Sequence, residues 1–371
     1  LFVVSAPNAK LLALHAAELA RSLADSTLPL ADIAYTLSAS RSHDALRAAI
    51  VATDKAGLLA ELETLAKLPE SGALPPKLGK GTLLAKVDPT QPAPKLAVMF
   101  PGQGSQRVGL LRSAIERFPV VRAQFAALAK VADELLPRPL TSYLFPQSSD
   151  AAELEAAELA LQATQVCQPA LASLGLSMLA LLRSLGLEPS VALGHSLGEF
   201  VAHAAAGTLS PEDAVKLVGW RGKLMSELAL DDPGAMAAVM AERAAVESAL
   251  AGIAGVGIAN INGPKQTVIS GTTAGVDAAT RALEAKSLVV KRLRVSHAFH
   301  SPAMGGIREG MQRVLEDLSF QTPKLPIVAA ARRACYPGDV ATSRQILAEH
   351  ATEAVDFDAA VRVAEEQDAR V

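Results

Sequence analysis

The chain has 371 residues, of which 50% are hydrophobic and 4% aromatic, so it is long enough for two or three compact units. A formal net charge of -3, without any lysine/arginine block, argues against nucleic acid and anionic membranes as partners. Two cysteines are too few for a disulfide framework or a metal cluster, so we expect Cys167 and Cys335 to be reduced thiols in a cytoplasmic protein without a metal. The longest apolar region, residues 171–187, is interrupted by Gly175 and Arg183, which favours a buried helix over a membrane span.

The first part of the chain, residues 1–93, is predicted to form a small α/β domain. The apolar patterning predicts strands at 2–4 and 48–52 and helices at 9–23, 30–37 and 55–65. Three prolines within residues 87–95 then mark a linker. Because the chain begins with Leu1 and no signal peptide precedes it, we expect it to be excised from a longer protein.

A second unit opens with a predicted strand at 96–100, followed by the glycine-rich turn of residues 101–106. Backbone amides of such a turn can point into a cleft and bind a phosphate or an oxyanion. The turn lacks the lysine and the spacing of a P-loop, so a nucleotide site is the weaker interpretation and a plain turn stays open. Helices are predicted downstream at 108–118, 123–136, 151–161 and 168–187.

The sequence Gly194-His-Ser-Leu-Gly198, after the apolar residues 191–193, has the pattern of a nucleophile elbow. At a sharp strand-to-helix turn, a base can reach the Ser196 hydroxyl and backbone N–H groups can stabilise an oxyanion. Taken alone, the five residues are equally compatible with a structural turn. A helix is predicted to end at Gly207, and the next to begin at Pro211 after the N-cap Ser210.

Residues 233–295 have a different pattern, in the order strand, helix, strand, strand, helix, strand, which is the ferredoxin-like order. The strands are predicted at 236–240, 256–261, 267–270 and 289–295, and the helices at 242–250 and 276–285. We therefore expect an α/β protein with an α/β-hydrolase-like large domain built on a parallel sheet (94–232 and 296–371), into which a ferredoxin-like domain is inserted. The last part of the large domain is predicted to contain a helix at 306–318, a strand at 325–329 and two further helical segments.

A serine nucleophile needs a base, and the candidates are His195, His203, His297, His300 and His350. His195 adjoins the serine and should point away, while His203 lies about 10 Å along the same helix at 1.5 Å per residue. His300 fits best, because it lies in a non-repetitive segment where the insertion ends. A capping or core histidine is the alternative.

Arg221 is the second informative charge, because it lies on a largely apolar predicted helix. Its guanidinium either extends to solvent or binds a carboxylate, and the residues alone do not separate the two.

Five motifs occur together in order: Phe100–Gln106, Gly194–Glu199, Trp220–Met225, Asn262–Gln266 and His297–Ser301. Together they resemble the malonyl-CoA:acyl-carrier-protein acyltransferase family, and specifically the acyltransferase domain of a modular polyketide or polyunsaturated-fatty-acid type synthase. Residues 1–93 resemble the linker that joins a preceding ketosynthase to such a domain.

This resemblance implies that Ser196 is the acylated nucleophile and His300 its base. The backbone amides of Gln103 and Leu197 would form the oxyanion hole, and Arg221 would clamp the free carboxylate of malonate. The implied substrates are malonyl-CoA and the phosphopantetheine thiol of an acyl carrier protein, and the implied neighbour is a ketosynthase. No bound cofactor is implied.

Further residues match positions that line the family's pocket: Gln168, His195, Asn262, His297 and Phe299. Family members with His-Ala-Phe-His at 297–300 take malonate, and Phe299 would fill the space that a methyl branch needs. Leu197 after the nucleophile favours malonate too. One methyl group discriminates by only about 1–3 kcal/mol, which limits the selectivity that such a pocket can reach.

The chain departs from the family in two places. Residues 329–335 lack the usual serine-asparagine-x-threonine-glycine motif, and the chain stops at Val371. There we expect a following glycine-proline segment to be missing, whose backbone carbonyl would orient the histidine. A serine hydrolase or thioesterase and an inactive structural module of a megasynthase are the alternative functions.

Overall fold

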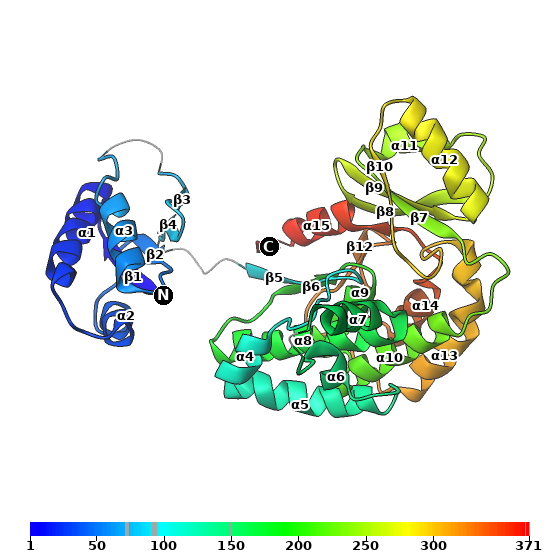
Figure 1. Ribbon diagram of the computed structural model, residues 1–371, viewed down its shortest axis with the longest axis horizontal. Helices are drawn as coiled ribbons and strands as arrows, with labels where there is room; N and C mark the ends of the chain where they lie inside the picture. Colours follow the sequence, from blue (N-terminus) through cyan, green and yellow to red (C-terminus); the bar gives the residue numbers. More distant parts are fainter. Residues whose placement is uncertain (71–73, 89, 91–94, 149, 368, 371) are drawn as a thin grey trace. The chain divides into compact units, whose positions relative to one another are not determined.

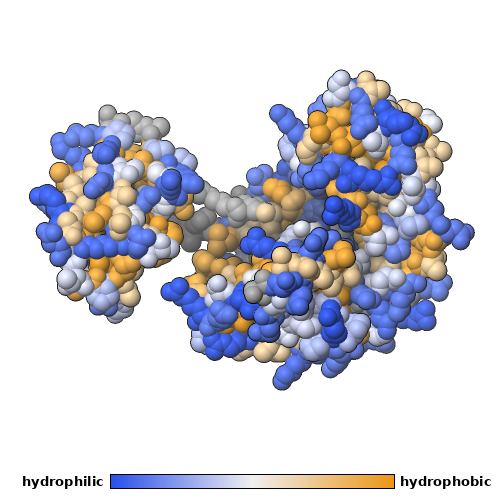
Figure 2. All heavy atoms as spheres, in the orientation of Figure 1, coloured by the Kyte–Doolittle hydropathy of each residue, from blue (hydrophilic) through white to orange (hydrophobic). Residues whose placement is uncertain are grey.

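The protein is described by a computed structural model that covers residues 1–70, 74–88, 90, 95–148, 150–367 and 369–370 (Figure 1). The chain divides into two compact units, Leu1–Ala93 and Pro94–Val371. Hydrophilic and hydrophobic side chains are interspersed on the visible face of each unit (Figure 2). Such a mixture is usual for a protein surface. Most of the linker predicted at 87–95 lies outside the described residues.

The first unit is an antiparallel sheet covered by three helices. The strand order is β1-β2-β4-β3, with β1 Phe2–Ala6, β2 Leu46–Ile50, β3 Lys77–Leu78 and β4 Thr82–Lys86. The helices are α1 Ala9–Ala24, α2 Leu30–Ala39 and α3 Lys55–Leu65. Asn8 and Asp54 cap α1 and α3 with side-chain oxygens, which satisfy N–H groups of the first turns. Strands β3 and β4 were not predicted. The turn between them is held by the Glu61 carboxylate, which accepts from the Gly81 N–H and the Thr82 hydroxyl and is distant from them in sequence.

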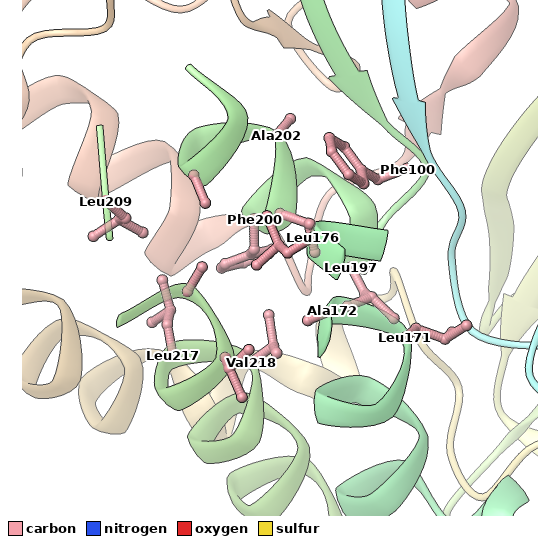
Figure 3. Close-up of a cluster of buried hydrophobic side chains, with 14 of the residues drawn as sticks. Phe100, Leu171, Ala172, Leu176, Leu197, Phe200, Ala202, Leu209, Leu217 and Val218 are labelled. Carbon is pink, nitrogen blue, oxygen red and sulfur yellow. The ribbon is translucent and has the colours of Figure 1, made fainter. Parts of the chain in front are cut away.

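The large part of the second unit surrounds a short parallel sheet of order β14-β5-β6. Its strands are β5 Lys95–Phe100, β6 Val191–Gly194 and β14 Ala369–Arg370, and Ile327 adds a parallel bridge to Ala192. Strand β6 is buried along its whole length, as expected for a parallel strand covered on both faces. Side chains of Phe100, Leu171, Leu197 and Phe200 meet in the core behind the end of this sheet (Figure 3).

Helices pack around this sheet: α4 Arg112–Arg117, α5 Pro119–Asp133, α6 Leu140–Leu144, α7 Ala151–Gln162, α8 Thr164–Ser184, α9 Leu197–Ala205, α10 Pro211–Ser226, η1 Pro302–Ile307, α13 Arg308–Asp317, α14 Val340–Glu349 and α15 Phe357–Glu366. Helix α8 was predicted to begin four residues later, at residue 168. It begins instead at Thr164, and Pro169 lies inside it. Among the described helices, α8 alone is long and apolar enough to cross a membrane, but 72% of its most apolar window is buried within the protein.

The inserted part of the second unit forms a separate antiparallel sheet backed by α11 Arg243–Leu250 and α12 Thr273–Ala285 (Figure 1). Its strands are β7 Ala235–Val239, β8 Val256–Gly263, β9 Gln266–Gly271 and β10 Val290–Arg292, in the order β10-β7-β9-β8. The elements follow the chain order predicted from the sequence. Strand β13 (Val355–Asp356) adds itself in parallel to β8, so the C-terminal region also contributes to this sheet.

Two segments differ from the prediction. Residues 108–111 are turns rather than helix, and α5 begins at Pro119, whose missing N–H suits a first helical position. Residues 329–335, which lack the sequence motif usual in the family, belong to a hairpin in which β11 Val328–Ala329 pairs with β12 Ala334–Cys335.

Candidate active site

Ser196 lies between β6 and α9 in a conformation that few non-glycine residues adopt, with φ 51° and ψ -112°. Two glycines make this turn possible. A Cβ on Gly194 would lie 1.9 Å from the carbonyl carbon of Gly198, and one on Gly198 would lie 2.1 Å from the Phe100 oxygen. The backbones of β5, β6 and α9 therefore approach so closely that side chains at these positions would collide. Strain of this kind at a partly buried serine that lines a cavity is typical of a nucleophile elbow.

His300 is within hydrogen-bonding distance of the Ser196 hydroxyl, with 2.8 Å between Ser196 Oγ and His300 Nε2. Its other ring nitrogen, Nδ1, lies 2.9 Å from the carbonyl oxygen of Glu353. Because a carbonyl only accepts, Nδ1 carries the proton and Nε2 is free to accept from the serine hydroxyl. The carbonyl thus sets the tautomer that a general base requires.

The backbone around His300 corrects one expectation. The orienting carbonyl was predicted to come from a segment beyond Val371, and that prediction was wrong. The turn between α14 and β13 already packs against the histidine, since the His300 N–H donates to the Ala351 oxygen at 3.0 Å and the Glu353 oxygen is two residues further on.

The imidazole of His300 is only 6% exposed. Burial lowers its pKa well below the ordinary value, electrostatic interactions with His350, Arg221 and His195 lower it further, and the hydrogen bond to the Glu353 carbonyl opposes this. The histidine is consequently neutral, and able to take a proton, over a wide pH range.

Gln103 and Leu197 line the same cavity as Ser196. Leu197 is the first residue of α9, so its backbone N–H has no acceptor within the helix. Gln103 belongs to the glycine-rich turn after β5, and its side-chain amide donates to Thr164 Oγ1 at 3.3 Å. The two residues are therefore placed where backbone N–H groups can face a developing oxyanion.

Arg221 on α10 is a buried cation, 3% exposed. Its Nη1 donates to Gln168 Oε1 at 2.9 Å, and its guanidinium lies 5.0 Å from the centre of the Phe200 ring. Burial lowers its pKa to about 10, so it stays protonated at neutral pH. Within the part of the chain that the structure describes, no carboxylate forms an ion pair with it. A buried guanidinium in this state can bind an anionic group that enters from outside.

A cavity of about 170 Å³ joins the serine, the histidine and the arginine. It lies between the large part and the inserted part, and its wall is formed by Gln103, His195, Ser196, Leu197, Arg221, Met225, Met236, Asn260, Asn262, Val268, Leu293, Val295, Phe299, His300 and Ala351. Two residues singled out from the sequence lie behind this wall. Gln168 contacts Arg221, and His297 makes contacts to Ser296 Oγ and the Leu228 oxygen.

His195 is on the wall but does not contact the serine hydroxyl. Its Nε2 lies 2.7 Å from Asn262 Oδ1, and Asn262 Nδ2 in turn donates to Gln266 Oε1 at 3.2 Å. Burial lowers the pKa of His195, although the hydrogen bond to Asn262 opposes this. The pair connects the elbow to strand β8 of the inserted part.

A buried acidic group behind the site was not identified from the sequence. Glu199 is completely buried, accepts from the Ala330 N–H at 3.1 Å and from the Tyr336 hydroxyl, and lies 3.6 Å from His350 Nε2. The one available signal was a carboxylate within the apolar helix after the elbow. His203 packs edge-on against Tyr336, with ring centres 4.5 Å apart, and takes no part in the cavity.

Comparison with known proteins gives two family matches. Residues 98–371 match the family described as acyl transferase domain, and residues 1–62 match the family described as CurL-like, polyketide synthase C-terminal. Among curated relatives, the chain is 37% identical over 359 residues to the phenolphthiocerol synthesis polyketide synthase Pks15/1 of Mycobacterium marinum. It is 36% identical over 346 residues to polyketide synthase GfsB of Streptomyces halstedii. The alignments cover 96% and 93% of the chain but only 16% and 6% of these relatives' own length.

Solved structures give the same grouping. The acyltransferase domain from module 8 of the salinomycin polyketide synthase superposes with a TM-score of 0.82 at 26% identity, covering 99% of this chain and 82% of that one. The malonyl CoA-acyl carrier protein transacylase of Coxiella burnetii superposes with a TM-score of 0.66 at 30% identity, covering 74% and 85%. The chain belongs to the acyl transferase domain family, with the acyltransferase domains of modular polyketide synthases as its relatives, and is an acyltransferase.

Proposed function

We propose that the chain transfers a malonyl group from malonyl-CoA to the phosphopantetheine thiol of an acyl carrier protein, through a malonyl ester on Ser196. The observation that carries this proposal is the buried Arg221 guanidinium, which faces the cavity of Ser196 without a carboxylate partner among the described residues. An acyl group with its own carboxylate would supply that partner. The similar protein of Coxiella burnetii, named for malonyl-CoA and acyl carrier protein, is consistent with this substrate pair.

In the first step, His300 Nε2 takes the proton from Ser196 Oγ as the oxygen attacks the thioester carbonyl. The tetrahedral oxyanion is stabilised by the backbone N–H groups of Gln103 and Leu197. When the intermediate collapses, the carbon–sulfur bond breaks and the histidinium returns its proton to the leaving thiolate of CoA. The product is malonyl-Ser196 and free CoA thiol.

In the second step, the same groups work with the carrier protein as acceptor. Neutral His300 takes the proton from the phosphopantetheine thiol, whose sulfur attacks the malonyl ester. Ser196 leaves with the proton from the histidinium, which restores the free enzyme. His300 carries the proton and two backbone N–H groups stabilise the oxyanion, so the proposed mechanism needs neither metal nor bound cofactor.

Arg221 would hold the malonate carboxylate, and Gln168 would hold Arg221. The Gln168 oxygen occupies one N–H of the guanidinium, which leaves further donors for a bidentate contact. An acetyl group would leave the buried charge unpaired, so the site should discriminate against it. Phe299, with the apolar Met225 and Met236 on the same wall, would limit room for a methyl branch and favour malonate over methylmalonate.

We further propose the following organisation. Residues 1–93 serve as the linker after a ketosynthase, which the match of residues 1–62 to a polyketide synthase C-terminal family supports. Residues 94–232 and 296–371 form an α/β-hydrolase-like domain and residues 233–295 a ferredoxin-like insertion, for which the strand order β10-β7-β9-β8 is the support. A cytoplasmic location fits a synthase that uses CoA thioesters.

The substitution Arg221→Ala tests the assigned carboxylate contact. We expect malonyl transfer to fall at least about 100-fold, because a buried charged hydrogen bond of roughly 3 kcal/mol is lost. Acetyl transfer should be retained or increased, because the unpaired charge is gone. The measurement is the ratio of kcat/KM for malonyl-CoA and acetyl-CoA, with Arg183→Ala, a half-exposed arginine on α8, as control. An unchanged ratio in Arg221→Ala would contradict the assignment.

A further inference from the structure

A line of hydrogen bonds outside the reacting atoms leads away from Gln103. Its side-chain Nε2 lies 3.3 Å from Thr164 Oγ1, and the hydroxyl oxygens of Thr164 and Ser296 are 3.1 Å apart. Ser296 Oγ lies 3.1 Å from His297 Nδ1, and His297 Nε2 lies 3.3 Å from the Leu228 carbonyl oxygen. Four segments that are distant in sequence are joined in this way.

The chemistry of the end groups gives this line a single direction. The Leu228 carbonyl only accepts, so His297 Nε2 donates to it, and in this tautomer Nδ1 accepts from the Ser296 hydroxyl. The oxygen of Ser296 is then free to accept from Thr164. Thr164 in turn accepts from the Gln103 amide, which can only donate through its nitrogen. Every hydroxyl donates once and accepts once, the arrangement in which such bonds strengthen one another.

The four segments include both connections between the large part and the inserted part. Leu228 lies between α10 and β7, where the chain leaves the large part, and Ser296 and His297 lie between β10 and η1, where it returns. Thr164, the first residue of α8, is 4% exposed. It is held firmly, since a Cβ on Gly222 of α10 would lie 2.8 Å from the Thr164 carbonyl oxygen.

We propose that Thr164 is a positioning residue for the oxyanion hole. Its hydroxyl holds the Gln103 side chain, fixes the turn after β5 and thereby aims the Gln103 backbone N–H at the oxyanion. Through the hydrogen bonds of Ser296 and His297, Thr164 also connects the turn after β5 to the two chain segments that join the inserted part to the large part. The inference rests on the proposed function for the role of Gln103. In this account, His297 acts through its hydrogen bonds to Ser296 and Leu228 rather than by lining the cavity.

Such a role has a defined kinetic consequence. An oxyanion donor contributes in the tetrahedral transition state and little to the bound thioester. Loss of its aim should therefore lower kcat and leave KM nearly unchanged. A residue that only stabilised the fold would lower the amount of active enzyme, and a residue that contacted the substrate would raise KM.

The test compares Thr164→Val with Thr164→Ser in the full chain. Valine keeps the shape and removes the hydroxyl, so we expect kcat for malonyl transfer to fall about tenfold or more while KM for malonyl-CoA stays within about twofold. Serine restores the hydroxyl and should restore kcat. Thr208→Val is the matched control, because the buried Thr208 hydroxyl has no hydrogen-bond partner within the described residues, and its kcat should stay unchanged.

Two results would overturn the proposal: an unchanged kcat in Thr164→Val, whether or not KM rises, or equal losses of kcat in the valine and serine variants. A second assay follows the burst of p-nitrophenol from p-nitrophenyl acetate, with Ser196→Ala as blank. It requires the serine, the base and the oxyanion hole but no malonyl group. A wild-type burst without malonyl transfer would contradict only the proposed function, and the burst rate of Thr164→Val would still decide on Thr164. Absence of both activities in the wild type would contradict both proposals.

Discussion

At the scale of single residues, the contact between Ser196 and His300 depends on which nitrogen of the imidazole carries the proton. The Glu353 carbonyl takes the place that an acidic residue occupies in many serine hydrolases, at 2.9 Å from Nδ1. A carbonyl fixes the tautomer without adding a negative charge that would stabilise the imidazolium. Burial keeps the base neutral by lowering its pKa, and the hydrogen bond to the Glu353 carbonyl acts in the opposite direction.

The lowered pKa of His300 predicts the pH dependence of acylation. The base acts only when it is neutral, and a lowered pKa extends the neutral form to lower pH. The acid limb of kcat/KM should therefore lie below the ordinary histidine pKa of about 6.5. The measurement is the rate of Ser196 acylation by malonyl-CoA at pH values from about 4.5 to about 8, a range that brackets the ordinary histidine pKa. A limb at or above the ordinary value would contradict the burial effect.

Motifs made the residues of the candidate site predictable, because serine, histidine and arginine occur there in short, recognisable sequence patterns. Thr164 and Glu199 escaped notice for a physical reason. A threonine at the start of a helix and a glutamate within one are common, and their importance comes from partners 132 and 131 residues away along the chain. Only the folded chain brings these pairs together.

At the scale of elements, helix α9 is tied to the β11–β12 hairpin by a single carboxylate. Glu199 accepts from the Ala330 N–H with one oxygen and from the Tyr336 hydroxyl with the other. Burial alone would raise the pKa of Glu199, but His350 and these two hydrogen bonds together lower it. The elbow helix thus gains a fixed attachment next to Ser196.

The substitution Glu199→Gln should weaken this attachment. An amide offers one acceptor oxygen instead of two, so one buried donor loses its partner, at a cost of about 1–3 kcal/mol in the free energy of unfolding. Urea denaturation at neutral pH measures this loss. Glu155→Gln on the exposed face of α7 is the control and should change stability by less than about 0.5 kcal/mol. Equal stability of the two variants would show that Glu199 does not hold the hairpin.

Long elements were predictable from their periodicity, whereas short strands were not. Helices α1, α10 and α12 follow from apolar spacing and capping residues in their own sequences. Strands β11 to β14 have two residues each, too few to show an alternating pattern, and exist through pairing with distant partners. The orienting carbonyl of Glu353 lies in this C-terminal region, whereas the resemblance to the family had placed it in a segment after Val371.

At the scale of the whole molecule, the second unit holds the reacting groups on the large part and closes the cavity with the inserted part. Ser196, His300 and Arg221 come from the large part, while Asn262 and Val268 reach the cavity from β8 and β9. Neither part alone would enclose the acyl group. The order of the inserted elements was predictable from sequence, but the addition of β13 to their sheet was not.

The central claim is that Ser196 carries a malonyl group between two thiols. Its most direct test is the intact mass of the protein after brief exposure to malonyl-CoA, with Ser196→Ala as control, followed by addition of a phosphopantetheinylated acyl carrier protein. We predict a malonyl adduct that requires Ser196 and moves to the carrier protein. No adduct in the wild type, an adduct of equal yield in Ser196→Ala, or an adduct that is released only to water would contradict the account.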